Sequence, residues 1–119
     1  MSVRKLAESK HYIIESEYET VYLYNKEDSS RTVIGDLYGD PEGAVIDKNE
    51  RFAVIYGEGV IIYRLRPPYQ EYLRCTVSPQ WIEIGRDDNV MWVESAVIDA
   101  DKLIIECEDG HREIDLRSI

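Results

Sequence analysis

Side chains that could carry out acid–base or nucleophilic chemistry are few in this sequence and lie far apart. The two histidines, His11 and His111, stand at opposite ends of the chain, and each begins a predicted strand, where a partly exposed histidine needs no special role. Cys75 follows Arg74, which can activate a neighbouring thiol, but the apolar alternation of this segment predicts a buried thiol that packs as a small hydrophobic group. The chain carries no Ser/His/Asp pattern, Walker-type loop, zinc-ligand spacing or dinucleotide fingerprint. The sequence therefore predicts a protein that is not an enzyme.

Carboxylates and glycines are frequent, but they cluster in predicted turns, where Asp bonds its own backbone. The stretches 39–43 and 57–59 are rich in glycine, yet they join strands and carry carboxylates, so they are interpreted as hairpin turns and not as phosphate-binding loops. None of the close carboxylate pairs has the spacing of a calcium loop. We therefore expect no cofactor and no metal. The pairs are Asp87 with Asp88, Asp99 with Asp101, and Glu106 with Glu108.

The charge balance limits the choice of partner. The 119 residues include 24 acidic and 14 basic side chains, a formal net charge of −10. Such a surface repels nucleic acid and anionic membranes and attracts basic proteins, although a negative surface also serves solubility alone. We expect a basic protein partner, no direct contact with nucleic acid and no membrane binding. The oligomeric state stays open.

The pattern of apolar residues predicts an all-β protein. Nine Tyr and two Trp, with many Val and Ile, stand against two Met and one Phe, a composition that favours strands. Apolar runs of four to eight residues alternate with turn sequences at a spacing too short for helices. We predict an antiparallel two-sheet sandwich or meander of about ten short strands with little helix. The strand candidates are residues 11–16, 20–25, 31–38, 44–48, 51–57, 60–65, 72–77, 80–86, 90–98, 102–108 and 111–117.

The chain reads as one domain over residues 11–119, preceded by a flexible N-terminal segment, residues 1–10, that is frayed or forms one short helical turn. Residues 44–47 (AVID) recur as residues 96–99, either as a weak internal repeat of a stacked sheet or by chance in a sequence rich in Val and Ile. No export signal is evident, so Cys75 and Cys107 are expected to be thiols and the location cytoplasmic.

If the strands run up and down, alternate turns lie at the same end of the sheets. One end then collects carboxylates without basic residues in the same turns, and such an end attracts a basic partner. This assignment depends on residues 72–77 being a strand, because otherwise Asp99 and Asp101 move to the other end. The acidic end comprises Glu17, Glu19, Asp40, Glu42, Glu58, Asp99 and Asp101, and the opposite rim comprises Lys26, Asp28, Arg31, Lys48, Arg51, Arg66, Arg86, Asp87 and Arg112.

A second candidate contact lies in the loop that follows Pro67 and Pro68. Tyr69 and Tyr72 flank Glu71 in this proline-stiffened segment and are of the residue type that anchors interfaces. The alternative is that both rings cover the edge of the sandwich. We include all three residues in the predicted partner-binding set.

The stretch from Ile34 to Leu65 (IGDLYGDPEGAVIDKNERFAVIYGEGVIIYRL), with the following RPPY up to Tyr69, resembles small acidic β-rich immunity proteins of bacterial contact-dependent growth inhibition and polymorphic toxin systems. The resemblance covers the middle third of the chain and carries over no individual residues. It implies a cytosolic inhibitor that binds a cognate toxin domain, commonly a nuclease, and occludes its active site or substrate surface. The alternative is a non-enzymatic interaction module of a larger bacterial assembly, and a third is a small enzyme with a carboxylate site.

Overall fold

The computed structural model describes residues 3–86 and 89–119, which form eleven strands in three antiparallel sheets. The prediction of an all-β fold is confirmed. The only helical element of the described residues is the 3-10 turn η1 (Leu116–Ser118). The first sheet contains β1 (Val3–Glu8), β2 (Tyr12–Glu17), β3 (Thr20–Asn25) and β4 (Ser30–Asp36). The second contains β5 (Gly43–Ile46), β6 (Phe52–Gly57), β7 (Gly59–Arg64) and β8 (Trp81–Ile84), and the third contains β9 (Val93–Asp99), β10 (Lys102–Cys107) and β11 (Gly110–Asp115).

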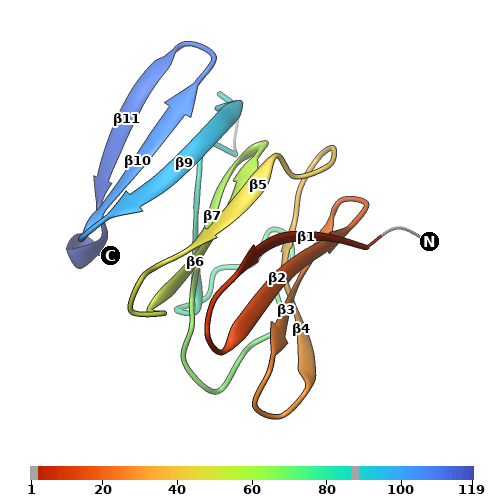
Figure 1. The fold of residues 1–119 in the computed structure, drawn as a ribbon. Helices are drawn as coiled ribbons and strands as arrows, with labels where there is room; N and C mark the ends of the chain where they lie inside the picture. The colour runs from red at the N-terminus through yellow and green to blue at the C-terminus, as the bar shows by residue number, and fades with distance from the viewer. Residues whose placement is uncertain (1–2, 87–88) are drawn as a thin grey trace.

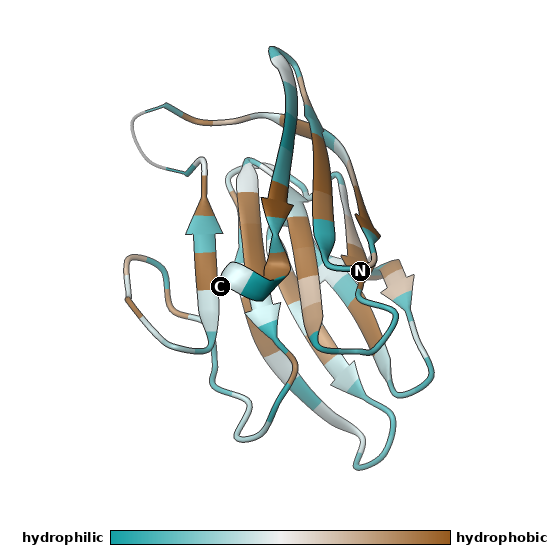
Figure 2. Cartoon of the chain, turned by 90° about the vertical axis from the view of Figure 1, so that its left-hand side faces the viewer, coloured by the Kyte–Doolittle hydropathy of each residue, from teal (hydrophilic) through white to brown (hydrophobic). Residues whose placement is uncertain are grey.

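The three sheets are stacked in the order in which the chain forms them. The second sheet lies between the first sheet and the third (Figure 1). Apolar residues occupy the middle of the strands, while most turns at their ends are hydrophilic (Figure 2). The structure therefore has three stacked sheets, one more than the predicted two-sheet sandwich.

The central sheet is buried on both faces, which explains why β6 and β7 are continuous apolar runs. Side chains alternate between the faces of a strand, so Ile61 points into one core and Ile62 into the other. Both are fully buried, at 0% exposure. Strands with one wet face, such as β2, instead alternate buried and half-buried positions. Continuous apolar strands are typical of sheets covered on both sides.

Each interface has its own hydrophobic core. Between the first and second sheets, Ile14 and Leu23 pack against Ile55 and Tyr63. Between the second and third sheets, the residues that meet are Val54, Ile62, Val93, Ala96, Leu103 and Ile105. The AVID segments begin the second and third sheets, since residues 44–46 lie in β5 and residues 96–99 lie in β9. Each therefore opens an antiparallel meander.

Two predictions of local structure are wrong. The N-terminal segment, expected to be frayed or helical, contributes β1, which pairs with β2 from Val3 opposite Glu17 to Glu8 opposite Ile13. Residues 72–77, expected as a strand, belong to a long connection between β7 and β8. Here Cys75 has a left-handed backbone (φ 62°), which interrupts an extended strand.

This connection is nevertheless anchored to the sheets. The backbone N–H of Tyr72 donates to the Val33 carbonyl (2.8 Å), and the Tyr63 hydroxyl donates to the Gln70 carbonyl (2.7 Å). Because residues 72–77 are not a strand, the chain has one strand fewer between β7 and β9 than the sequence predicts. Every later turn therefore lies at the other end of the sheets from the one predicted. Within the described ranges the structure holds no helix that is long and apolar enough to cross a membrane.

The two-sided burial of the central sheet generates a test. We expect Ile61→Ala and Ile62→Ala each to lower the free energy of unfolding by about 2–5 kcal/mol, because each leaves a cavity in a different core. Urea unfolding of the purified variants measures both. Val97→Ala is the control, since Val97 is 55% exposed and its truncation should cost about 0.5 kcal/mol or less. An Ile62→Ala variant as stable as this control would contradict the second interface.

The cysteines provide a second test. Both are free, as expected, but the burial prediction for Cys75 is wrong, because Cys75 is exposed and Cys107 is buried. Burial raises the pKa of the Cys107 thiol, which further reduces its reactive thiolate fraction. We expect a thiol reagent such as DTNB to modify one cysteine rapidly in the native protein and the second only after denaturation. Equal rates for both cysteines would contradict this arrangement.

Candidate functional site

A hollow with a volume of about 550 Å³ opens at the end of the molecule where four connections of the second and third sheets meet. They are the β4–β5 loop, the β6–β7 turn, the residues that lead into β9 and the β10–β11 turn. Three predicted residues, Asp40, Glu42 and Glu58, line it together. The described residues that line it are Tyr38, Gly39, Asp40, Glu42, Gly57, Glu58, Trp92, Val93, Glu94 and Glu108.

Four of the five carboxylates in this hollow are exposed and form no ion pair with any described residue: Asp40, Glu42, Glu94 and Glu108. None of the described lining residues is a lysine or an arginine. A nearby cation is Arg4, whose guanidinium donates to the Pro41 carbonyl beside the hollow. Like charges gathered in one concave surface add their fields, so the hollow favours cations.

Two aromatic side chains stand at the same site. Tyr38 is 71% exposed and Trp92 is 44% exposed, although most aromatic surface in a folded protein is covered. The backbone of Trp92 is held by an antiparallel bridge to Glu58 and by the N–H of Glu108, which donates to its carbonyl (3.2 Å). These rings are therefore presented by ordered backbone, and their faces attract cations.

Glu58 differs from the other carboxylates of the hollow. It was predicted as an exposed turn residue, which is wrong, because only 8% of it is exposed. The same carboxylate oxygen accepts two hydrogen bonds, one from the Tyr38 N–H (2.7 Å) and one from Nη2 of Arg86 (3.0 Å). Glu58 thus positions Tyr38 in the wall of the hollow, and its charge is already neutralised.

Arg86 links three parts of the fold. Its side chain is 7% exposed and donates to Glu58, to Glu83 (2.6 Å), to the Tyr72 hydroxyl (2.9 Å) and to the Asp36 carbonyl (2.7 Å). Burial would lower the pKa of Arg86, but Tyr72, Glu58 and Glu83 outweigh it and raise the pKa. The placement of Arg86 on the opposite rim is therefore wrong, because it lies beside the acidic hollow as a buried structural cation.

The remaining predicted carboxylates at this end, Glu17 and Glu19, do not line the hollow. Glu17 ends β2, and Glu19 lies in the β2–β3 turn, where its carboxylate accepts from the Gly39 N–H (2.5 Å). Because Gly39 belongs to the lining, Glu19 fixes the β4–β5 loop.

The predicted contact in the proline-rich connection is separate from the hollow. Tyr72 is 4% exposed, and its hydroxyl donates to Glu83 (2.8 Å). Tyr69 shares a 2.6 Å hydrogen bond with the Tyr12 hydroxyl, and Glu71 accepts from the Val33 N–H (2.7 Å). The two rings cover the edge of the sheets, and their prediction as an exposed aromatic anchor is wrong for Tyr72.

The opposite end holds the two acidic residues that were assigned to the wrong side. Asp99 ends β9, and Asp101 binds Arg51 (2.9 Å), which also binds Asp47 (2.6 Å). Burial of Asp47 would raise its pKa, but the Arg51 guanidinium outweighs this and lowers it. Asp47 and Asp101 therefore share one arginine and join the second sheet to the third, whereas Asp99 has no ion pair with the described residues.

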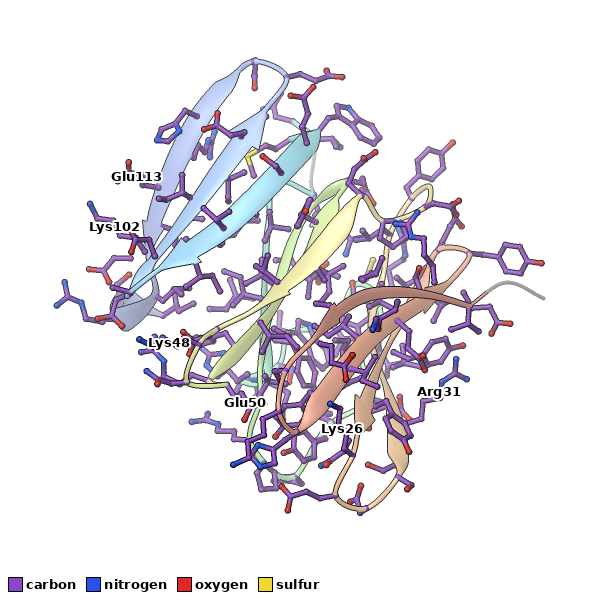
Figure 3. The ribbon with its side chains drawn as sticks, in the orientation of Figure 1. Lys26, Arg31, Lys48, Glu50, Lys102 and Glu113 are labelled. Atoms are coloured by element: carbon purple, nitrogen blue, oxygen red, sulfur yellow. The ribbon has the colours of Figure 1, made fainter. Side chains whose placement is uncertain are left out.

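Both histidines lie away from the hollow. His11 binds Glu50 through Nδ1 (2.6 Å) in the β5–β6 turn, the region labelled by Lys48 and Glu50 in Figure 3. Burial would raise the Glu50 pKa, but hydrogen bonds from His11 and Ser9 lower it to about 2. His111 lies on exposed β11 between Glu106 and Glu113. No group of three or more His, Cys, Asp or Glu side chains suited to a metal ion occurs in residues 3–86 and 89–119.

Four of the aromatic and acidic lining residues were not predicted from the sequence, namely Tyr38, Trp92, Glu94 and Glu108. Tyr38 and Trp92 were placed inside predicted strands, where aromatic residues are ordinary. Glu94 and Glu108 were missed because the false strand at residues 72–77 put the start of β9 and the β10–β11 turn at the other end. The one available signal was that Pro67, Pro68 and Pro79 flank that false strand.

The Arg86 contacts generate a stability prediction. We expect Arg86→Met to lower the free energy of unfolding by about 3–5 kcal/mol, because it leaves the buried Glu58 charge without its cation. Urea unfolding gives the value. In Glu58→Gln/Arg86→Met the buried charge is removed too, so the double variant should lose less than the sum of the two single losses. Additive losses would contradict direct coupling of the pair.

Comparison of the chain with protein-family models, with curated protein sequences and with solved structures finds no match, so the geometry and charge of the hollow carry the functional argument.

Proposed function

We propose that this protein is an immunity protein: a cytoplasmic, non-enzymatic inhibitor that binds the basic toxin domain of its own bacterial system through the acidic hollow. The observation that carries the proposal is the group of four exposed carboxylates that have no ion pair within the described residues and share one concave surface with Tyr38 and Trp92. The resemblance of residues 34–69 to immunity proteins supports the choice of partner class.

The chemistry of the hollow matches a basic protein surface. A nuclease is basic where it holds phosphates, and a surface that binds phosphate also accepts carboxylates. The guanidinium or ammonium groups of such a surface can pair with Asp40, Glu42, Glu94 and Glu108 while Trp92 and Tyr38 supply apolar contact area. Interfaces commonly combine aromatic anchors with charged surroundings in this way.

Occlusion, not chemistry, is the mechanism we propose. The carboxylates of the hollow come from β9 and from loops and turns that join strands, so little conformational freedom is lost on binding. The partner's cationic groups would be covered and could no longer hold a substrate phosphate. The alternative function, a non-enzymatic interaction module of a larger assembly, would use the same hollow. The two functions differ in which protein is bound there.

A charge-reversal experiment tests the binding face. We expect Glu42→Lys/Glu94→Lys to weaken binding of the toxin domain encoded beside this gene by about 100-fold or more, because each new lysine repels the basic partner. Biolayer interferometry with the purified domains measures affinity, and growth after toxin expression measures protection. Glu58 is left unchanged, because its substitution would break the buried ion pair with Arg86 and lower the stability of the protein.

The matched control is Glu27→Lys/Asp99→Lys, which makes the same change in net charge at the opposite end. Both residues are exposed and have no ion pair with the described residues. This variant should bind within a few-fold of the wild type. If it fails as badly as the hollow variant, net charge and not the hollow decides binding. If both bind normally, the assigned face is wrong.

Salt dependence tests electrostatic steering separately. The association rate should fall markedly when ionic strength rises from about 0.05 M to 0.5 M, because the screening length shrinks from more than 10 Å to a few Å. Stopped-flow fluorescence of Trp92 and Trp81 can follow association. An association rate that does not depend on salt would contradict electrostatic steering. The location of the binding face is tested separately by the charge-reversal experiment.

A further inference from the structure

We infer a second binding site, for a small anionic ligand, in a cavity at the end of the molecule opposite the acidic hollow. The cavity has a volume of about 370 Å³ and lies where the end of β7 meets the start of β6 and the C-terminal segment after β11. Arg64 and Arg66 supply the positive charge, and the ligand class is a carboxylate or phosphate monoester with an apolar body. This inference does not depend on the proposed function.

The backbone fixes Arg64 in the sheet. Arg64 is paired with Phe52 across β6 and β7, and paired residues of an antiparallel ladder project to the same face. Its backbone N–H donates to the Gln80 carbonyl (2.8 Å), and the neighbouring Leu65 N–H donates to the Arg51 carbonyl (2.9 Å). Arg66 follows two positions after Arg64, and its N–H donates to the Arg64 carbonyl (3.0 Å). Both arginines therefore start from ordered backbone and line the same cavity.

The two arginines stand out because nearby carboxylates are already engaged elsewhere. Glu50 and Arg51 also line the cavity, but Glu50 accepts hydrogen bonds from His11 and Ser9, and Arg51 binds Asp47 and Asp101. Arg64 donates through Nη1 to the Pro79 carbonyl (2.7 Å), and neither Arg64 nor Arg66 has an ion pair with the described residues. Arg64 and Arg66 are therefore two guanidinium groups without a carboxylate partner among the described residues, in a chain of net charge −10.

The shape and lining of the cavity define the ligand class. Planar guanidinium groups bind carboxylates and phosphates through paired N–H donors. Phe52, Leu65 and Ile119 supply apolar lining next to these donors. A volume of this order fits a small molecule, and the overall negative charge disfavours long polyanions. The combination favours one oxyanion group attached to an aromatic or aliphatic body.

Titration with phenyl phosphate, benzoate and inorganic phosphate tests the site in the full-length protein. We expect saturable binding of phenyl phosphate or benzoate by isothermal titration calorimetry, with Kd of about 1 mM or tighter, and weaker binding of inorganic phosphate, which lacks the apolar body. Comparison of the first two probes shows whether the site prefers phosphate or carboxylate. Amide shifts at Arg64–Arg66 in ¹H–¹⁵N spectra locate the bound probe.

Arg64→Gln/Arg66→Gln should reduce the affinity by about tenfold or more, while Arg112→Gln should leave it unchanged. Arg112 is an exposed arginine on β11 that also has no ion pair with the described residues, so it controls for charge. Thermal melts confirm that each variant is folded. Absence of saturable binding for all three probes, binding that survives the double substitution, or binding of polyanionic oligonucleotides alone would overturn the inference.

Discussion

Burial of both faces of β6 and β7 is the constraint on which the rest of this structure depends. Adjacent residues such as Ile61 and Ile62 are both fully buried, and a strand can bury both only when each of its faces is covered. The first sheet covers one face and the third covers the other. A 119-residue chain can build three layers because each sheet is a local meander, so that few residues are spent on crossing between layers.

The same stacking brings turns of separate sheets together at each end, and the presence or absence of a cation decides what their carboxylates do. Asp47 and Asp101 share Arg51 and thereby join the second sheet to the third. Glu58 shares Arg86 with Glu83 and joins the turn of β6 and β7 to the end of β8. Asp40, Glu42, Glu94 and Glu108 have no such cation within the described residues. Identical chemical groups are therefore structural where a guanidinium is paired with them and available where it is not.

The sequence predicts most of the strands because period-two alternation and turn residues are local signals. It does not predict the third layer, although the unbroken apolar runs of β6 and β7 are consistent with it. The error at residues 72–77 shows why topology is harder than strand assignment: YLRCTV alternates like a strand, but Tyr72 is buried by contacts with Glu83 and Arg86, while Cys75 adopts a left-handed backbone. That single error moved Asp99 and Asp101 to the wrong end and hid Glu94 and Glu108, whereas Asp40 and Glu42, which precede it, lie together with Glu58 at one end, as predicted.

Separation of the two proposed sites to opposite ends has an electrostatic consequence. The two sites lie at opposite ends of β6 and β7, and six-residue strands span about 20 Å, which exceeds the screening length of about 8 Å at physiological ionic strength. The proposed basic partner would therefore be attracted by the end with available carboxylates, and the guanidinium groups of Arg64 and Arg66 at the other end would act on it only weakly. The second cavity would then stay open to solvent in the complex, because the partner approaches from the opposite side. The rigid central sheet lies between the sites, so an anion bound beside Arg64 would influence the hollow only by shifting β6 or β7, whose side chains are packed on both faces.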